Sequence, residues 1–207
     1  TLSLEDNLVR ALAILREPRT DRAVARVDLA HNLATGGGHA DLAVEDLTFD
    51  ERLQPIHLTP LSEGVVALVR GTVTGTGRID WSETEVTSSG RFSSDSLDFA
   101  AAFGPVKGAS GTIEFTDLLG LTTAPNQRVR VASINPGIEV TDGEIEIEIR
   151  RGEVLALRGG TWPFMGGTLT LRPVDINFGE AEVRRYVLEI VGLDAARFVE
   201  RMELNNI

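Results

Sequence analysis

The stretch GEIEIEIRRGEVLAL, residues 143–157, contains two runs of alternating apolar and polar residues, and each run begins with a glycine. A period of two places every second side chain on the same face of a β-strand. The same alternation occurs in GTIEF, residues 111–115, and in GGTLTL, residues 166–171. These runs predict a sheet with one polar and one apolar face, and the apolar face needs a cover.

Short glycine-bounded runs of this kind follow one another from about residue 71 to residue 190. No strong amphipathic helix follows each run, which argues against a parallel sheet built from βαβ units. We therefore expect a mainly β fold with an elongated, strongly curved antiparallel sheet. We treat residues 1–207 as a single unit, with a helix over 1–16, a β region over 21–191 and a short helix over 194–202.

The two terminal helices are predicted from capping residues and periodicity. Ser3 can cap the first helix, whose apolar residues Leu4, Leu8 and Leu12 share one face. Asp194 can cap the second helix. We expect both helices to pack at the ends or the mouth of the sheet and to cover part of its apolar face, because a short isolated helix is only marginally stable.

Glycine and proline divide the first part of the β region. Three consecutive glycines at residues 36–38 suit a hairpin turn between two strands within residues 23–49. The segment 50–63 contains Pro55 and Pro60, so we expect it to be extended or to lie at an edge, because proline cannot donate to a central ladder. Separate short strands are then expected at residues 65–69, 71–76 and 78–81.

Bulk composition excludes several classes of partner. The formal net charge of -11 argues against nucleic acid, which needs clustered lysine and arginine to neutralise phosphates. The chain has no cysteine, so it has neither a disulfide framework nor a thiolate metal site. It has no apolar run of 18 residues and no signal peptide, and it begins at Thr1 without a methionine. We therefore expect it to be a fragment of a longer protein.

Histidines suggest one candidate metal site. His31 and His39 flank the glycine turn and could face each other across the hairpin, near Asp28 or Asp41. The alternative is that both are exposed polar residues on the solvent face. We favour this alternative and predict no metal site.

Glutamates suggest one candidate catalytic pair. Glu144, Glu146 and Glu148 alternate along one run, and two carboxylates on a sheet can serve a glycosidase. Their strict alternation with isoleucines is instead typical of the polar face of an amphipathic strand, and we favour this interpretation. We predict no catalytic residue and no cofactor.

Alternating apolar residues are the strongest candidates for a functional surface. They would form a long one-sided apolar face, which is either the dry core of a sandwich or an open trough that holds a lipid chain. Periodicity alone favours the sandwich core. The candidate lining residues are Ile79, Trp81, Phe99, Ile113, Phe115, Ile145, Ile147, Ile149, Leu155, Leu157, Leu169 and Leu171.

Four segments carry a resemblance to a known family. They are FGPVKGASGTIEFTDLLGLTTAPNQ (103–127), INPGIEVTDGEIEIEI (134–149), GGTWPFMGGTLTLRP (159–173) and LEIVGLDAARFVE (188–200). Together they resemble the periplasmic region of AsmA-like proteins of the YdbH type, which are intermembrane phospholipid transport proteins related to TamB. The resemblance covers about residues 71–207 and is weaker before that.

The resemblance implies a periplasmic protein that is tethered to the inner membrane of a Gram-negative envelope in its full-length form. It implies a U-shaped apolar groove, lined by the residues named above, that shields phospholipid acyl chains. It implies no catalytic residues, and it makes an outer-membrane lipoprotein a candidate partner. Two alternatives remain open: a carbohydrate-active β-helix or sandwich enzyme, and a structural or adhesive β domain with a closed core.

Overall fold

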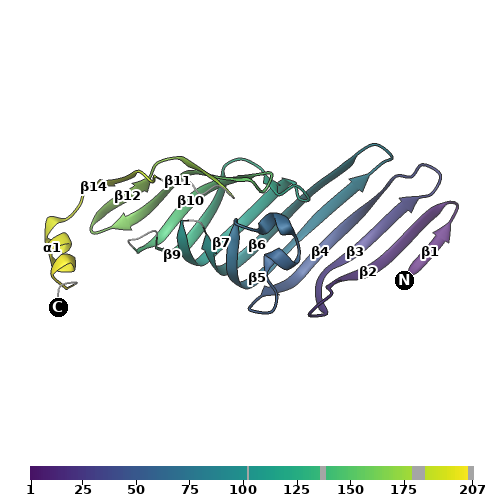
Figure 1. The fold of residues 1–207 in the computed structure, drawn as a ribbon, viewed down its shortest axis with the longest axis horizontal. Coiled ribbons are helices and arrows are strands. Elements are labelled where there is room, and N and C mark those ends of the chain that lie inside the picture. Colours follow the sequence, from purple (N-terminus) through teal and green to yellow (C-terminus); the bar gives the residue numbers. More distant parts are fainter. Residues whose placement is uncertain (102, 136–138, 179–184, 205–207) are drawn as a thin grey trace.

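A single antiparallel sheet contains all the strands of the part of the chain that the structure describes (Figure 1). The structure is a computed structural model that describes residues 1–101, 103–135, 139–178 and 185–204. The strands before the middle of the chain are β1 (Leu2–Glu5), β2 (Leu8–Glu17), β3 (Arg22–Asn32), β4 (Gly38–Phe49), β5 (Val66–Trp81), β6 (Val86–Ala101) and β7 (Gly104–Asp117). The later elements are β8 (Thr122–Thr123), β9 (Gln127–Ile134), β10 (Val140–Arg150), β11 (Val154–Phe164), β12 (Gly167–Leu171), β13 (Val174–Asn177), β14 (Leu188–Val191) and the helix α1 (Ala195–Leu204).

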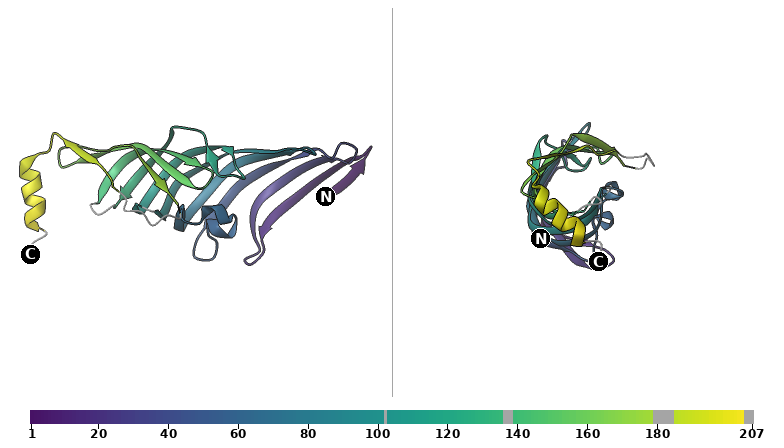
Figure 2. Two further views of the ribbon diagram at one scale, coloured as in Figure 1. Left: turned by 45° about the horizontal axis from the view of Figure 1, so that its top comes forward. Right: turned by 90° about the vertical axis from the view of Figure 1, so that its left-hand side faces the viewer.

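Sheet order almost follows chain order. The hydrogen-bonded path is β1-β2-β3-β4-β5-β6-β7-β9-β10-β11-β12-β14, while β8 pairs with β7 and β13 pairs with β11. The strands run across the long axis of the molecule and curl, so that an end-on view shows a C-shaped cross-section (Figure 2). The expectation of a mainly β, elongated and curved antiparallel sheet is confirmed. We call the inside of the C the concave face and the space that it encloses the trough.

Bulges account for the curvature. The register shifts between Val44 and Leu47 on β4, at two places on β5 and β6, and between Glu146 and Ile147 on β10. Gly108 on β7 has a φ of 59°, and an ideal Cβ placed on it would lie 2.7 Å from the Cβ of Ala132 on β9. A bulge bends its strand and increases the local twist. Because bulges recur on neighbouring strands, the whole sheet bends in one direction.

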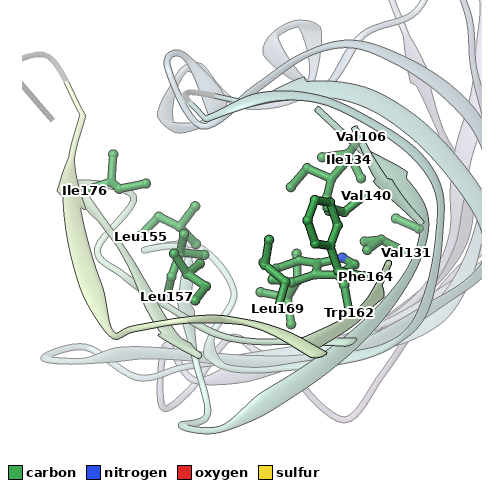
Figure 3. Close-up of a cluster of buried hydrophobic side chains, with 13 residues drawn as sticks. Val106, Val131, Ile134, Val140, Leu155, Leu157, Trp162, Phe164, Leu169 and Ile176 are labelled. Carbon is green, nitrogen blue, oxygen red and sulfur yellow. The ribbon is translucent and has the colours of Figure 1, made fainter. Parts of the chain in front are cut away.

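Apolar side chains form two clusters on the concave face. The cluster near the C-terminal end includes Val106, Val131, Ile145, Leu157 and Trp162, and Figure 3 shows it inside the C. The middle cluster contains Ala25, Val44, Leu47, Phe49, Leu53 and Val69. Leu97 and Phe99 pack against both clusters, so the two are continuous.

The expected N-terminal helix over residues 1–16 is wrong, because this segment is the hairpin of β1 and β2. Asp6 and Asn7 form its turn with φ angles of 45° and 65°. Two left-handed residues in a two-residue loop match the twist of paired strands, as in a type I′ turn. The sheet therefore begins at Leu2, and the N-terminal segment covers no apolar face as a helix.

Two further sequence predictions are confirmed and two are wrong. The hairpin around residues 36–38 and the helix after Asp194 are confirmed, and Asp194 Oδ1 accepts hydrogen bonds from the N–H groups of Ala196 and Arg197 at 2.9 and 3.4 Å. The three short strands within residues 65–81 are one strand, β5. The segment 50–63 is not simply extended, because it contains the 3₁₀ helices η1 (Pro55–His57) and η2 (Pro60–Ser62).

Over residues 195–200, whose side chains the structure describes, helix α1 does not pack against the apolar face of the sheet. Its residues 195–200 are all exposed, including Phe198 and Val199. Its start is attached to the sheet, because the N–H of Asp194 donates to the carbonyl of Met165 at 2.9 Å. The expectation that the C-terminal helix covers part of the apolar face is therefore wrong.

Candidate functional site

The sequence-predicted lining residues lie on the concave face. Residues paired directly across antiparallel strands share a face, and Ile79 pairs with Ala40, Ile113 with Phe92, and Trp162 with Leu169. The same pairing joins Ile147 to Leu157 and Ile149 to Leu155. The candidates therefore share one surface that runs across many strands.

Their surroundings differ along the trough. Ile145, Leu155, Leu157, Leu169 and Leu171 are buried in the C-terminal cluster, and Phe99, Ile147 and Ile149 pack against it. The rings of Phe115 and Phe92 meet edge to face with centroids 6.0 Å apart. Ile79, Trp81 and Ile113 are half-buried and belong to neither cluster. The structure therefore brings eight of the twelve together in one cluster and spreads the rest toward the N-terminal end.

Sequence reasoning missed the contribution of the first strands. Val27, Leu29 and Leu42 lie on the concave face, since Val27 pairs with Leu42 and Leu29 with Ala40. Leu2 and Leu4 of β1 continue this face, with 76% and 62% of their surfaces exposed. The alternation in RVDLAH, residues 26–31, was the available signal. The apolar surface therefore extends to the first strand of the sheet.

Trp81 and His31 form a polar contact on the concave face near its N-terminal end. The indole Nε1–H of Trp81 donates to His31 Nδ1 at 3.2 Å, and the two rings stack with centroids 6.0 Å apart. The indole ring also lies over Gly38, where an ideal Cβ would be 2.6 Å from an indole carbon. The bond to Nδ1 places the proton of neutral His31 on Nε2.

A cavity of about 320 Å³ lies within the C-terminal cluster. This volume is at the lower end of the range for small-molecule sites, about 300 to 1,000 Å³. Figure 3 shows several of the lining side chains pointing into the C. The lining residues are Phe103, Ile134, Val140, Ile145, Leu157, Trp162, Leu169, Leu171, Tyr186 and Leu188. None of them is charged, so the cavity suits an apolar ligand.

Charged residues occupy the convex face. Arg78 lies 2.9 Å from both Asp41 and Asp80, and hydrogen bonds to Asp80 and then Asp41 raise the pKa of Arg78. Arg91 lies 2.8 Å from Glu114. Exposed pairs of this type contribute only about 0 to 1 kcal/mol each. Their main effect is to make the convex face hydrophilic over β4 to β7, whereas Leu12 and Ile14 of β2 are exposed on the same face.

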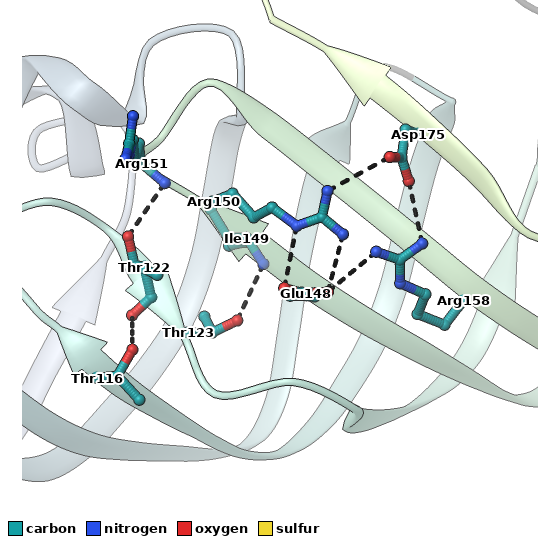
Figure 4. A network of polar contacts seen from close by, with 9 residues as sticks. All are labelled: Thr116, Thr122, Thr123, Glu148, Ile149, Arg150, Arg151, Arg158 and Asp175. Carbon is teal, nitrogen blue, oxygen red and sulfur yellow. Dashed lines mark hydrogen bonds and ion pairs between the residues drawn. The ribbon is translucent and has the colours of Figure 1, made fainter.

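The densest ion-pair network covers the outside of β10, β11 and β13 (Figure 4). Glu148 accepts hydrogen bonds from Arg150 and Arg158 at 3.0 and 3.1 Å, and both arginines reach Asp175, at 3.5 and 3.3 Å. The bond to Glu148 raises the pKa of Arg150. Ala156 lies between Glu148 and Asp175 in the register and is 0% exposed. The network therefore covers Ala156 on the convex side of the trough wall.

The glutamates and histidines that the sequence suggested as site residues do not come together in one site. Glu144 and Glu146 lie 3.7 and 3.9 Å from Arg128, in ion pairs. His39 pairs with Ala30, and the adjacent register pair is His31 with Gly38. Adjacent pairs point to opposite faces of a sheet, so the two histidines lie on opposite faces. Within the described residues, no group of three potential ligands could hold a metal ion.

The segment between β4 and β5, residues 50–65, is anchored at the ends of these two strands, and we call it the strap. Leu53 is 0% exposed within the middle cluster. The side-chain amide of Gln54 donates to the carbonyls of Asp50 and Val69 at 2.6 and 2.8 Å, and its oxygen accepts from the Val69 N–H at 2.8 Å. The strap is therefore fixed to one lip of the trough.

The strap also contacts the opposite lip. Because antiparallel strands alternate in direction, the turn after β10 lies at the other lip from the turn after β4. An ideal Cβ on Gly152 would lie 3.3 Å from Leu61 Cβ, and one on Gly64 would lie 3.6 Å from Phe178 Cβ. Figure 2 shows the two short helices of the strap beside the open side of the C. The strap thus bridges the opening at this level.

Comparisons with known proteins gave one match. A family model described as YdbH-like, intermembrane phospholipid transport protein YdbH, matches residues 2–207. The comparison with curated proteins found no match, and neither did the comparison with solved structures. The part of the chain that the structure describes contains no helix that is long and apolar enough to span a membrane.

Proposed function

Because the chain belongs to the YdbH-like family of intermembrane phospholipid transport proteins, we propose that its concave face shields phospholipid acyl chains as they pass along the trough. This is a family of lipid transport proteins and not of enzymes. The observation that carries the proposal is the continuity of the apolar face from β1 to β14, with charged pairs on the convex side. Each methylene removed from water contributes about 0.8 kcal/mol, so even partial shielding of a chain is favourable.

The dimensions of the trough suit this role. Twelve strands hydrogen-bond in succession, and a spacing of about 4.8 Å gives a trough roughly 50 Å long. Both ends remain apolar and exposed, at Leu2 and Leu4 of β1 and at Leu188 and Ile190 of β14. A lipid chain could therefore stay on apolar surface from one end to the other. A sandwich core would need a second sheet, whereas every described strand belongs to one sheet.

An intermembrane transport family acts in the cell envelope. We extend this to a periplasmic position, a tether to the inner membrane in the full-length protein, and an outer-membrane lipoprotein as partner. These three points rest on the family resemblance.

Photocrosslinking tests the proposal with a matched pair of positions on β7. A benzophenone amino acid replaces Ile113 on the concave face or Glu114 on the convex face, in cells that produce the protein in their envelope. We expect phospholipid adducts by mass spectrometry at position 113 and none at position 114. Equal adducts at both positions, or none at 113, would refute an acyl-chain path over the concave face.

A further inference from the structure

The cavity in the C-terminal cluster contains two buried polar atoms that have no hydrogen-bond partner among the described residues. They are the indole Nε1 of Trp162 and the hydroxyl of Tyr186, and both residues line the cavity. Leaving a buried donor without a partner is unfavourable, because the group loses its hydrogen bonds to water and gains none in return. Such a group in an otherwise apolar cavity is a candidate contact for a ligand atom.

The two buried polar atoms have different surroundings. An ideal Cβ on Gly143 would lie 2.0 Å from both Cδ1 and Nε1 of Trp162, so this edge of the indole rests on the wall of the sheet. Trp162 is also only 3% exposed. Tyr186 belongs to the segment before β14, is partly buried and packs against the cluster. The Nε1 edge of the indole is therefore turned to the sheet wall, and the buried tyrosine hydroxyl remains as the candidate contact for a ligand in the cavity.

The lining residues limit which part of a lipid can enter. None of them is charged, and an ionised phosphate would lose its hydration without gaining a counter-charge. An ester carbonyl is neutral, accepts hydrogen bonds and is joined directly to an acyl chain. The cavity chemistry thus matches the ester end of an acyl chain, with the phosphate outside.

We propose that this cavity is a holding site for one ester-linked acyl chain, and that the Tyr186 hydroxyl donates a hydrogen bond to the ester carbonyl. The proposal rests on the lipid-shielding function above and adds a specific contact to it. Along an apolar trough, movement has no preferred stopping point. A single hydrogen bond from Tyr186 to the ester carbonyl supplies a preferred stopping point. It also distinguishes ester-linked from ether-linked lipids.

The test compares two soluble lipids that differ only in this carbonyl. Dihexanoyl phosphatidylglycerol and its dihexyl ether analogue are titrated as monomers into the purified chain, by calorimetry. We expect the wild type to bind the diester more tightly. Tyr186→Phe should weaken diester binding about threefold to tenfold, the range for one net hydrogen bond, and leave diether binding unchanged.

A control and a second readout separate a direct contact from a change in packing. Thr161→Val removes a hydroxyl from the opposite face of β11 and should change neither affinity, since Thr161 pairs with Glu144 and Thr170. Tyr186 is the only tyrosine of the chain, so ¹³Cζ-labelled tyrosine gives one NMR signal. The signal should shift with the diester and not with the diether.

The outcomes distinguish this proposal from the proposed function. Two results would overturn the Tyr186 contact and leave the trough function intact. One is that the wild type binds both lipids without preferring the diester. The other is that Tyr186→Phe loses the same affinity for both lipids. If the wild type binds neither lipid and gives no crosslink at position 113, both proposals fail.

Discussion

At the scale of single residues, both tryptophans of the chain lie over glycines of a neighbouring strand. Trp81 covers Gly38 and Trp162 covers Gly143, and a Cβ on either glycine would collide with the indole. The sequence showed these glycines as turn or strand boundaries. It could not show that a tryptophan ring covers each of these glycines. The tryptophan is distant in the sequence, and only the strand register places it there.

Charge on the concave face gives the first prediction. Ile147 is partly buried on the wall of the trough, and a carboxylate there would lose hydration beside apolar neighbours. We expect Ile147→Asp to reduce uptake of a pyrene-labelled phospholipid from vesicles while far-ultraviolet circular dichroism stays unchanged. Thr161→Asp, on the convex face, is the control and should take up lipid normally. Normal uptake by Ile147→Asp would argue against passage over this position.

Glu17 gives a prediction on acid stability. The Thr20 hydroxyl foremost, with Arg19 and backbone N–H groups, lowers the pKa of Glu17 from 4.5 to about 2. A lowered pKa stabilises the fold above the unfolded value, and this stabilisation is lost as the pH falls from about 4.5 to about 2. The free energy of unfolding of Glu17→Gln, from urea titrations, should therefore fall less steeply over this range. An identical pH slope in variant and wild type would contradict it. Asp50, whose pKa the Arg22 side chain foremost lowers to about 2, and Asp117, whose pKa the Gly120 N–H foremost lowers, contribute to the slope that remains.

At the scale of elements, the sequence predicted strand faces better than strand ends. Alternation placed the candidate lining residues on one face because side-chain direction depends only on local periodicity. The N-terminal segment was misassigned because LVRALAILRE has both helical propensity and apolar residues at helical spacing. Pairing with β3 decided the outcome, and the adjacent Asp6 and Asn7 were the local turn signal.

Glycine also marks bulges inside strands, and the sequence alone does not distinguish a bulge glycine from a turn glycine. Gly71 lies within β5 and Gly108 within β7, where both have positive φ angles and mark irregularities inside a continuing strand. A bulge and a turn both need glycine, and only the partner strand distinguishes them. The curvature of the trough therefore could not be located from the sequence.

Bulge geometry gives a prediction at this scale. Gly108→Ala should lower the free energy of unfolding by at least about 1 to 2 kcal/mol, because an L-residue is strained at this φ and its Cβ would meet Ala132. Gly159→Ala is the matched control, because its added Cβ would have no neighbour closer than 3.8 Å. Urea unfolding followed by tryptophan fluorescence measures both. Equal effects of the two substitutions would contradict a strained bulge at Gly108.

At the scale of the whole molecule, the strap gives a direct test of closure. The Cβ of Phe178 lies 3.6 Å from an ideal Cβ on Gly64, within the disulfide range of about 3.5 to 4.5 Å. The chain has no cysteine of its own. We expect Gly64→Cys with Phe178→Cys to form an internal disulfide under mild oxidation, visible as a mobility shift on non-reducing gels.

Oxidised and reduced forms of the same double variant provide the energetic comparison. The left-handed backbone at Gly64 strains a cysteine equally in both forms, so this cost cancels. Closing a loop of about 100 residues stabilises by roughly 4.7 kcal/mol in the chain-entropy description, and measured values are typically about 2 to 4 kcal/mol. Cysteines that remain reduced would show that the strap does not bridge the two lips.

The strands run across the trough, so the length of the trough is counted in strands. Each strand added to the sheet extends the reach by about 4.8 Å and leaves the cross-section unchanged. A gain or loss of one hairpin changes the reach by a fixed step of about 10 Å. The length of apolar surface along the trough therefore changes only in whole strands.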